Sequence, residues 1–483
     1  MKLLIKKIHI ICFYLIVFFP NNITLCNKLG LYQAIQTALK YNETILYNAK
    51  LNYLSSNSQL RLAEAEYKTQ INFSVNLNNS YSYSLDPDAI ESYSNITSSD
   101  IELSQRFLMP LGGKLDFVLD HQVQMNGSAS FYSSPRFHFI YNQPLDLAGI
   151  ESGHYNIISA RKSHSLSRIS LLLKKEELIL LVIDSYFRVW QLYKEVEQRT
   201  LDFASANRML EIAELRLKGG QISEFEVMNI QVQQKLSEDE LKVSQNELKS
   251  QKIFLLRLLG QNLNRDIQLI EEIDIDPVQF DLESAIKTAF QNRLEIQQSK
   301  INLELSDLRL KQAISSSYPK LNITGNYAFY SFSDNTLGAA LSNFPNRSWY
   351  LLSTVSFPII DGGLRSNEVQ IEKYDYENQR EYIKLLHEEI AIEIENYLRS
   401  LQVHLQRIKS LTLNLNIAKE TLNISEIRFK QGQISSTEVE NIRQRFMTAQ
   451  FSLNNAKISY ITQSAYLAKA MGVLDNWVKR LCY

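Results

Sequence analysis

Two periods of apolar residues follow each other along this 483-residue chain. In the segment 364–430, apolar residues recur at spacings of four and three: Ile390, Ile394, Tyr397, Leu401, Ile408, Leu411, Leu415, Ala418, Leu422 and Phe429. The segment 151–218 has a similar series: Tyr186, Val189, Tyr193, Val196, Phe203, Leu210 and Leu217. A period of 3.5 residues indicates helices packed side by side at shallow angles. At about 1.5 Å per residue, each helix would extend about 100 Å, so the pattern predicts an elongated molecule.

A period of two residues replaces this pattern in other segments. In INFSVNLN, which starts at Ile71, and in LNITGNYAF, which starts at Leu321, apolar and Asn, Ser or Thr residues alternate. Alternation indicates strands with one apolar and one polar face, which occur in soluble sandwiches and in membrane barrels alike. A polar face of this composition beside very long helices favours a barrel with lipid outside and water inside.

The chain is internally duplicated. RLKGGQISEFEV starts at Arg216, and RFKQGQISSTEV starts 212 positions later at Arg428. LYQAIQTALKYN at Leu31 and LESAIKTAFQNR at Leu282 match at an offset of 251, and the matches keep the same order in both halves. The smaller offset late in the chain places about 37 extra residues in the first half, between Tyr81 and Arg136.

The fold class we expect is mainly α with a β-barrel portion. The expected divisions are a signal peptide at 1–26, a first repeat at 27–262, a linker at 263–281, a second repeat at 282–472 and a C-terminal tail at 473–483. The first repeat has helices at 31–66, strands within about 70–147 with an insert at about 82–135, a long helix at 151–218 and a helix at 222–259. The second has helices at 282–317, strands within 319–360, a long helix at 364–430 and a helix at 435–471.

The strands are too few to close a barrel within one chain. Four follow from the duplication, at about 70–80, 136–146, 319–331 and 348–359, and the insert can add a hairpin that turns at LGGK, 111–114. An open sheet edge cannot lie in lipid. The chain must therefore oligomerise, and three copies of four strands would give twelve.

The N-terminus and the composition narrow the class of protein. Lys2, Lys6 and Lys7 precede an apolar run at 8–19, as in a secretory signal peptide, and no later apolar run is long enough for a spanning helix. Cys26 leaves a lipid anchor open, although Leu25 before it is not the small residue that lipidation would require. A net charge of −1 gives no reason to expect nucleic acid as a partner.

Nothing in the sequence indicates catalysis. The seven histidines have no metal-ligand spacing, and the three cysteines form no disulfide pattern. His404 falls within the helical apolar series, which predicts a packed residue, and the GGK at 112–114 lacks the rest of a phosphate-binding loop. We therefore expect no enzyme activity, no cofactor and no metal.

The chain resembles the TolC-type outer-membrane efflux channel family over nearly its whole mature length. The resemblance rests on the AI-x-x-A helices after Leu31 and Leu282, on the QPL and FPIIDGG strand ends, and on the two R-x-x-x-G phrases. It implies a homotrimer with a twelve-stranded barrel in the outer membrane and a helical tunnel of about 100 Å in the periplasm. It also implies docking to a periplasmic adaptor protein and an inner-membrane pump. The long insert departs from the family pattern.

The duplicated phrase predicts two helical reversals. Ser223 and Glu226, and likewise Ser435 and Glu438, have the spacing of a capping box, in which each side chain binds the other residue's backbone N–H. Gly220 and Gly432 follow the preceding helices, where a left-handed residue closes a C-terminus.

The resemblance places these reversals at the periplasmic tip of the tunnel. In the family's second tip, an acidic pair lies six and nine residues after the glycine. Here Glu438 fills the first position and Asn441 the second, while Glu226 and Asn229 take the same positions in the first half. Three copies of Glu438 would form one ring of negative charge, which favours cations at the entrance.

Arg216 and Arg428 allow two readings. A cation in the last turn of a helix is favourable for the helix dipole, and the resemblance implies contact with an adaptor. The function we expect is an outer-membrane duct of a tripartite efflux or type I secretion system. The alternatives are an envelope coiled-coil protein without a channel and a surface adhesin. The sequence does not identify the cargo.

Overall fold

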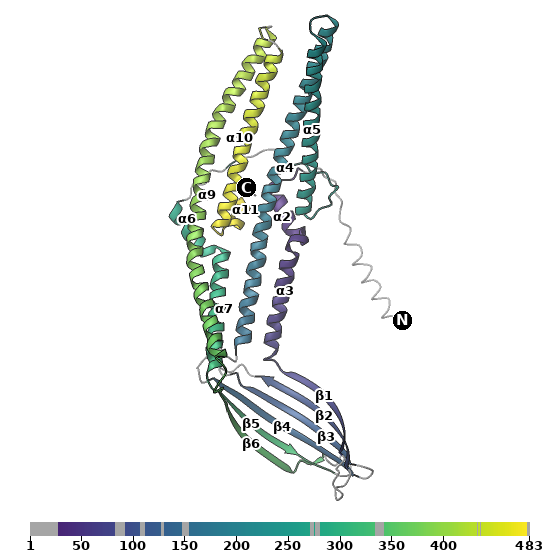
Figure 1. Ribbon diagram of the computed structural model, residues 1–483, viewed down its shortest axis with the longest axis vertical. Coiled ribbons are helices and arrows are strands. Elements are labelled where there is room, and N and C mark those ends of the chain that lie inside the picture. Colours follow the sequence, from purple (N-terminus) through teal and green to yellow (C-terminus); the bar gives the residue numbers. More distant parts are fainter. Residues whose placement is uncertain are drawn as a thin grey trace, which may run out of the picture.

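The computed structural model describes residues 28–82, 92–106, 112–126, 130–146, 154–270, 275, 281–333, 342–431, 433–434 and 436–480. Within these residues the chain forms a long bundle of helices with a six-stranded sheet at one end (Figure 1). The expected signal peptide at 1–26 and Cys26 lie outside them.

The helices follow the predicted duplication. The first half contains α2 (Leu31–Tyr41), α3 (Glu43–Ala65), α4 (Tyr155–Lys218) and α5 (Glu224–Leu258). The second contains α6 (Leu282–Asn292), α7 (Leu294–Ser317), α9 (Leu364–Lys430) and α10 (Ser436–Ala470), and α11 (Leu474–Arg480) lies within the expected C-terminal tail. With 64 and 67 residues, α4 and α9 confirm the two long helices.

Each long helix packs along two shorter helices. α4 contacts α5 over one part of its length and α3 over the other, and α9 contacts α10 and α7 in the same way (Figure 1). Contacts of α4 with α7 and α10 join the two halves side by side. The result is a wall with the order α5–α4–α10–α9 near the tips and α3–α4–α7–α9 nearer the sheet.

Each of the helical segments expected at 31–66 and 282–317 consists of two helices. Asn42 ends α2 and caps α3, because its side-chain oxygen accepts the N–H of Ile45 at 3.0 Å. Arg293 breaks the second pair with extended backbone, at φ −65° and ψ 128°. Neither residue is glycine or proline, so no strong helix breaker marks these breaks in the sequence.

The same two residues hold the ends of the shorter helices. The amide of Asn42 donates to the carbonyl of Leu258 at the end of α5, at 2.8 Å. The guanidinium of Arg293 donates to the carbonyl of Ala470 at the end of α10, at 3.5 Å. The last carbonyls of a helix have no partner within the helix, so each bond satisfies such a carbonyl and stacks two helices end to end.

At each of these two end-to-end contacts, which we call the joints, a glycine allows the two helices to approach closely. Gly260, with φ +63°, lies so near the backbone that a Cβ would be 2.4 Å from the carbonyl oxygen of Tyr41. Gly472, with φ +68°, would place a Cβ 2.7 Å from the backbone of Asn292. Both the left-handed backbone and the lack of space require glycine.

The apolar period of the long helices matches their packing. Ile390, Ile394, Leu401 and Ile408 of α9 are buried, and His404 is half-buried within the same series. In α4, Tyr186 and Val189 are buried as expected. The prediction is wrong for Tyr193, which is 47% exposed because it lies on a face that no described element of the chain covers.

The sheet contains six strands in chain order, each antiparallel to the next. They are β1 (Gln70–Ser82), β2 (Ser92–Arg106), β3 (Lys114–Asn126), β4 (Ser130–Asp146), β5 (Lys320–Tyr330) and β6 (Asn346–Ser356). The four strands expected from the duplication are β1, β4, β5 and β6. The insert forms the hairpin β2–β3, whose final pair, Arg106 with Lys114, is at the expected turn.

Among the described helices, none is sufficiently long and apolar to span a membrane.

Glu176 is a half-buried carboxyl of α4 close to the joint of the second half. Burial, followed by the charge of Glu295, raises its pKa from 4.5 to about 7, although Lys469 and Arg293 partly oppose the shift. The folded chain therefore binds this proton more tightly than the unfolded chain. The resulting stabilisation is present below about pH 4.5 and is lost as the pH rises through 7.

We expect Gly260→Ala to destabilise the protein far more than Gly220→Ala. Both glycines have positive φ, so each alanine costs about 1 kcal/mol of backbone strain. A Cβ at Gly220, however, would have no other atom within 4 Å and would cause no overlap. Overlap at Gly260 adds about 2 kcal/mol. Thermal unfolding in detergent measures both, and equal losses of stability would contradict a close-packed joint.

Glu176→Gln should flatten the pH dependence of stability. The amide stays neutral, so the decline in the melting temperature between about pH 5 and pH 8 should become smaller. Glu177→Gln is the matched control, because Glu177 is the next residue and its side chain is exposed. An unchanged slope in the Glu176 variant would mean that another group causes the dependence.

Candidate functional site

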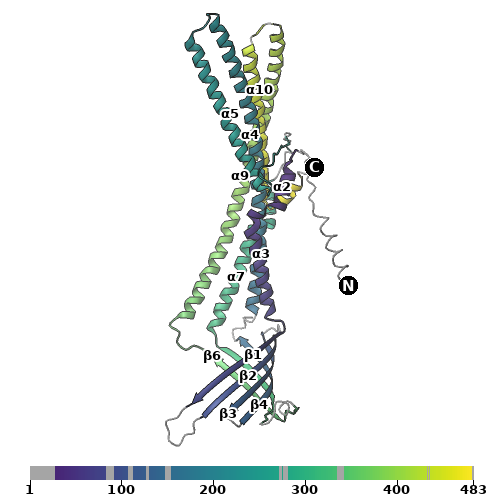
Figure 2. The same cartoon turned by 90° about the vertical axis from the view of Figure 1, so that its right-hand side faces the viewer.

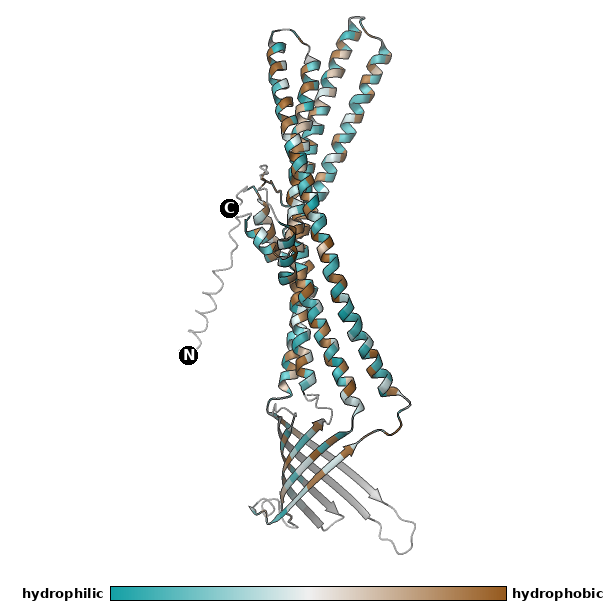
Figure 3. Ribbon diagram, turned by 90° about the vertical axis from the view of Figure 1, so that its left-hand side faces the viewer, coloured by the Kyte–Doolittle hydropathy of each residue, from teal (hydrophilic) through white to brown (hydrophobic). Residues whose placement is uncertain are grey.

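The register of the sheet separates an apolar face from a polar face. Neighbouring positions on one face are Phe73 with Ile101, Phe117 with Phe139, and Tyr327 with Trp349. The other face carries the even-numbered residues of the strands, among them Asn72, Asp116, Asn142 and Thr324. Of these, Asn142 and Thr324 are cross-strand neighbours. Figure 3 shows this alternation along the coloured strands. The pattern confirms the two-faced strands expected from the sequence.

The apolar face is exposed and the polar face is more enclosed. Trp349, Leu351 and Phe73 are 66–75% exposed, whereas Asp116, on the opposite face, is 8% exposed. Side chains on the concave side of a curved sheet screen one another, so the polar face is the concave one. A water-filled lumen on that side and lipid on the other would satisfy both faces.

Charged side chains pair on the concave face. Lys114 and Asp116 of β3 are 2.9 Å apart, and Asp120 is 2.8 Å from His138 of β4. Three of these four residues belong to the inserted hairpin, so the insert contributes ionisable groups to the polar face. In the part of the chain that the structure describes, no cluster of His, Cys, Asp or Glu could hold a metal ion.

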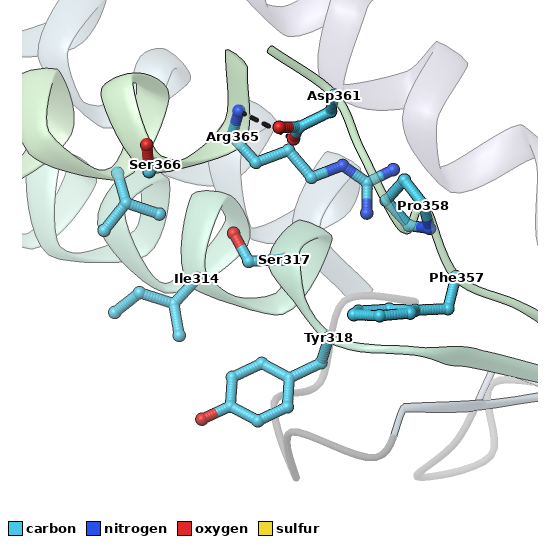
Figure 4. A pocket seen from close by; sticks show the side chains of 9 residues that line it. Ile314, Ser317, Tyr318, Phe357, Pro358, Asp361, Arg365 and Ser366 are labelled. Atoms are coloured by element: carbon cyan, nitrogen blue, oxygen red, sulfur yellow. Dashed lines mark hydrogen bonds between the residues drawn. The ribbon is translucent and has the colours of Figure 1, made fainter. Parts of the chain in front are cut away.

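A hollow of about 460 Å³ lies where the sheet meets the helices (Figure 4). It is lined by Ile314 and Tyr318 at the end of α7, by Phe357 and Pro358 directly after β6, and by Arg365 at the start of α9. The lining is mostly apolar and the hollow is open to the surface.

Asp361 fixes the backbone where the sheet meets the helices. Its carboxylate accepts the N–H of Gly363 at 2.9 Å and that of Arg365 at 3.2 Å, which begins α9 (Figure 4). These backbone hydrogen bonds, first that of Arg365, lower the pKa of Asp361. Gly362 and Gly363 both have positive φ, so the DGG of the FPIIDGG motif is explained by the turn from strand to helix.

The first tip has the predicted reversal. The N–H of Gln221 binds the carbonyl of Arg216 at 2.9 Å across Gly220, whose φ is +67°. Ser223 Oγ accepts the N–H of Glu226 at 3.2 Å, and the Glu226 carboxylate accepts the N–H of Ser223 at 3.1 Å. The capping box therefore accounts for Ser223 and Glu226, and the left-handed turn accounts for Gly220.

The second tip begins in the same way. The N–H of Gln433 binds the carbonyl of Arg428 at 2.9 Å, as in the first tip. Gly432 and Ser435 lie outside the described residues. Glu438 and Asn441 are exposed near the start of α10, and Glu226 and Asn229 are exposed near the start of α5. The four predicted entrance residues thus lie at the two tips, which splay apart in a single chain (Figure 2).

Polar contacts connect the two helical hairpins between the joint and the tips. The hydroxyl of Tyr466 donates to Asp184 at 2.7 Å, and the amide of Gln444 donates to Asp202 at 3.2 Å. Burial and the Asp184 carboxylate raise the pKa of Tyr466. Nearer the tips, Arg208 and Glu440 are 4.0 Å apart. This pair is the longest of the three contacts, and beyond it the two hairpins diverge (Figure 2).

The sequence reasoning missed the joint residues, although the repeat contains a signal for them. Gly260 and Gly472 are separated by the same 212 positions as Arg216 and Arg428. Asn42 and Arg293 are separated by the same 251 positions as Leu31 and Leu282. A comparison of the two halves residue by residue would have shown that the glycine is kept and that the residue at the break differs.

A protein-family model described as outer membrane efflux protein matches residues 285–473. TolC of Vibrio cholerae is 21% identical over 308 residues, which are 62% of this chain and 69% of that protein. The match confirms the resemblance drawn from the sequence, and with it an outer-membrane location with helices that extend into the periplasm.

Two solved structures share the fold. The CmeC outer membrane channel of Campylobacter jejuni has a TM-score of 0.67 at 16% identity, over 92% of this chain and 86% of that one. The outer membrane protein VceC of Vibrio cholerae has a TM-score of 0.64 at 15% identity, over 92% and 96%. At these identities the likeness shows the fold.

Proposed function

We propose that this chain, which carries an outer membrane efflux protein domain at residues 285–473, forms a homotrimeric export duct of a tripartite efflux or type I secretion system. The duct receives cargo from a periplasmic adaptor and an inner-membrane pump and releases it outside the cell. It performs no chemistry, and the pump supplies the energy.

The observation that supports this proposal best is that each chain has two unlike sides. β1, α3 and α5 lie along one side, and each has its main contacts with a single neighbouring element. β6 and α9 lie along the opposite side (Figure 1). When one side binds the unlike side of the next copy, successive copies are related by the same rotation. They form a closed ring if that rotation returns to the first copy.

Apolar residues on the two sides support contact between copies. Phe225, Met228 and Val232 of α5 are exposed at helical spacing, and so are Leu413, Ile417 and Ile424 of α9. Exposed apolar stripes of this length are unusual on a monomer and mark an interface. When α5 of one chain packs on α9 of the next, both stripes leave water.

The chain is also continuous from the sheet to the tips. α3 leads into β1, β4 into α4, α7 into β5 and β6 into α9, all at the same end of the bundle. The wall of helices therefore continues the wall of strands. A ring of such chains encloses one passage with an apolar belt around its sheet end, which suits a channel better than a coiled-coil spacer or an adhesin.

The entrance of the duct is formed by the helical tips. Three copies of Glu438 and Asn441 surround the axis, with Glu226 and Asn229 on the neighbouring hairpins. Arg216 and Arg428, both exposed at the ends of α4 and α9, are positioned for an adaptor, together with the turns at Gly220, Ser223, Gly432 and Ser435. Opening separates the hairpins at the tips, a shift of packed helices between two arrangements.

Purified protein should form trimers that conduct ions across a planar bilayer, because a closed ring encloses water from end to end. Native mass spectrometry measures the oligomer, and bilayer recording measures the conductance. A stable oligomer with no conductance at any voltage would favour the envelope coiled-coil alternative. Cleavage within residues 83–91 in whole cells by an added protease, without conductance in bilayers, would favour an adhesin.

Glu438→Gln should lower the preference of the channel for cations and weaken its block by divalent ions, because three negative charges leave the entrance. Glu226→Gln is the matched control. Glu226 is bound in the cap of α5, with its carboxylate on the backbone of its own hairpin, so its loss should cost about 0.5–1 kcal/mol of stability and change selectivity less than the loss of Glu438. Reversal potentials in a salt gradient measure selectivity. If the Glu438 variant behaves like the control, Glu438 is only a helix cap.

A further inference from the structure

The inserted hairpin β2–β3 is an integral part of the sheet. It lies between β1 and β4, and its 15 and 13 residues make it as long as the strands around it. β1 and β2 pair at every position from Gln70 with Ser104 to Ser82 with Ser92, and β3 pairs with β4 over the same length. A surface flap would pair over a few residues near the outer end.

The hairpin also keeps the two faces of the sheet in phase. Ile71 is level with Leu103, and Leu103 is level with Phe117. A shift of one residue would have put polar positions on the apolar face. The hairpin therefore extends the same apolar belt, as strands in contact with lipid must.

At the junction of the sheet with the helices, the hairpin adds two strands to the sheet but adds no helix. The pair Arg106 with Lys114 ends the hairpin beside Asn142 of β4, close to the end where β4 leads into α4. Gly113 lies close to β4 there, because a Cβ on it would be 2.6 Å from the side-chain oxygen of Gln143. The inner end of the hairpin thus lies where the sheet meets the helices, and there four helices, α3, α4, α7 and α9, adjoin six strands.

Among the strands that the structure describes, each outer strand of the sheet has one partner. β1 pairs with β2 and β6 pairs with β5, and the residues of β6 are exposed along almost its whole length. Free strand edges cannot remain unpaired in lipid. The only occupant that fits both edges is another copy of this chain, since β1 continues the α3–α5 side and β6 continues the α9 side that form the trimer interface.

We propose that three copies close a barrel of eighteen strands, six from each chain, in place of the twelve implied by the resemblance. The inference rests on the trimer of the proposed function. Barrel diameter grows roughly linearly with strand number, so the lumen is about 1.5 times as wide as that of a twelve-stranded barrel. The helical tunnel keeps twelve helices near the tips, so the outer portal is wider than the passage that feeds it.

The proposal can be tested by excising the hairpin. Ser82 and Ser130 both lie at the outer end of the sheet, so replacing residues 83–129 with a short Gly-Ser loop lets β1 turn directly into β4. The variant should form a twelve-stranded barrel. Polyethylene glycols of graded size, added from the side of the sheet during bilayer recording, report the width of the portal.

We expect the largest polymer that enters the native channel to be about 1.5 times as wide as the largest that enters the excised variant. Entry of the same sizes into two conducting trimers would overturn the eighteen-stranded barrel and leave the duct intact. Absence of trimers or of conductance in the native protein would instead overturn the proposed function.

Cysteine pairs in the full chain test the inference independently of whether the excised variant folds. Ser74→Cys with Asp100→Cys joins register partners of β1 and β2, and a disulfide should form within one chain. Ser74→Cys with His138→Cys joins β1 to β4 and should stay reduced, because β2 and β3 lie between them. The reverse result, with only the second pair oxidised, would show that the hairpin lies outside the barrel.

Discussion

The architecture depends on stacking two short helices end to end beside each long helix. α5 meets the start of α3 at Gly260, and α10 meets the start of α7 at Gly472, with a glycine in left-handed conformation at each contact. The side chains of Asn42 and Arg293 bind the carbonyls that the stacked helices leave free. Without these joints, α4 and α9 would be covered over only part of their length. The wall would then expose its apolar seam where the two halves of the molecule meet.

The two joints solve the same problem with different chemistry. Asn42 is neutral and 4% exposed, so its amide needs only hydrogen-bond partners. Arg293 brings a charge into a site that is 8% exposed, and it is paired with Glu393 at 2.6 Å and Glu295 at 3.2 Å. Burial of a charge is tolerated when it is paired and hydrogen-bonded. Glu176 lies beside this cluster, and its own burial together with the charge of Glu295 raises its pKa to about 7, so its charge is only partly compensated there.

Much of the fold could be predicted from the sequence, because its signals are periodic and long. The buried series from Ile390 to Ile408 and the two-faced strand at Ile71 follow directly from spacing, and the duplication confirmed their order. The breaks at Asn42 and Arg293 have no local helix-breaking signal, since their cause is a contact with a helix more than 170 residues away in the chain, and only the duplication points to them. At the candidate site, spacing alone predicted the cap of Ser223 and Glu226. The contacts of Asp184 with Tyr466 and of Asp202 with Gln444 depend on how the two halves pack, which no local pattern contains.

The hairpin β2–β3 begins and ends at the outer edge of the sheet, so it can enter or leave the gene product without displacing a helix. Each such event changes the chain by two strands, and the trimer proposed above by six. The helical half of the chain would be inherited unchanged. Selection on the width of the outer opening can therefore act separately from selection on assembly. Related channels can then differ in the width of their outer opening while their helices stay the same.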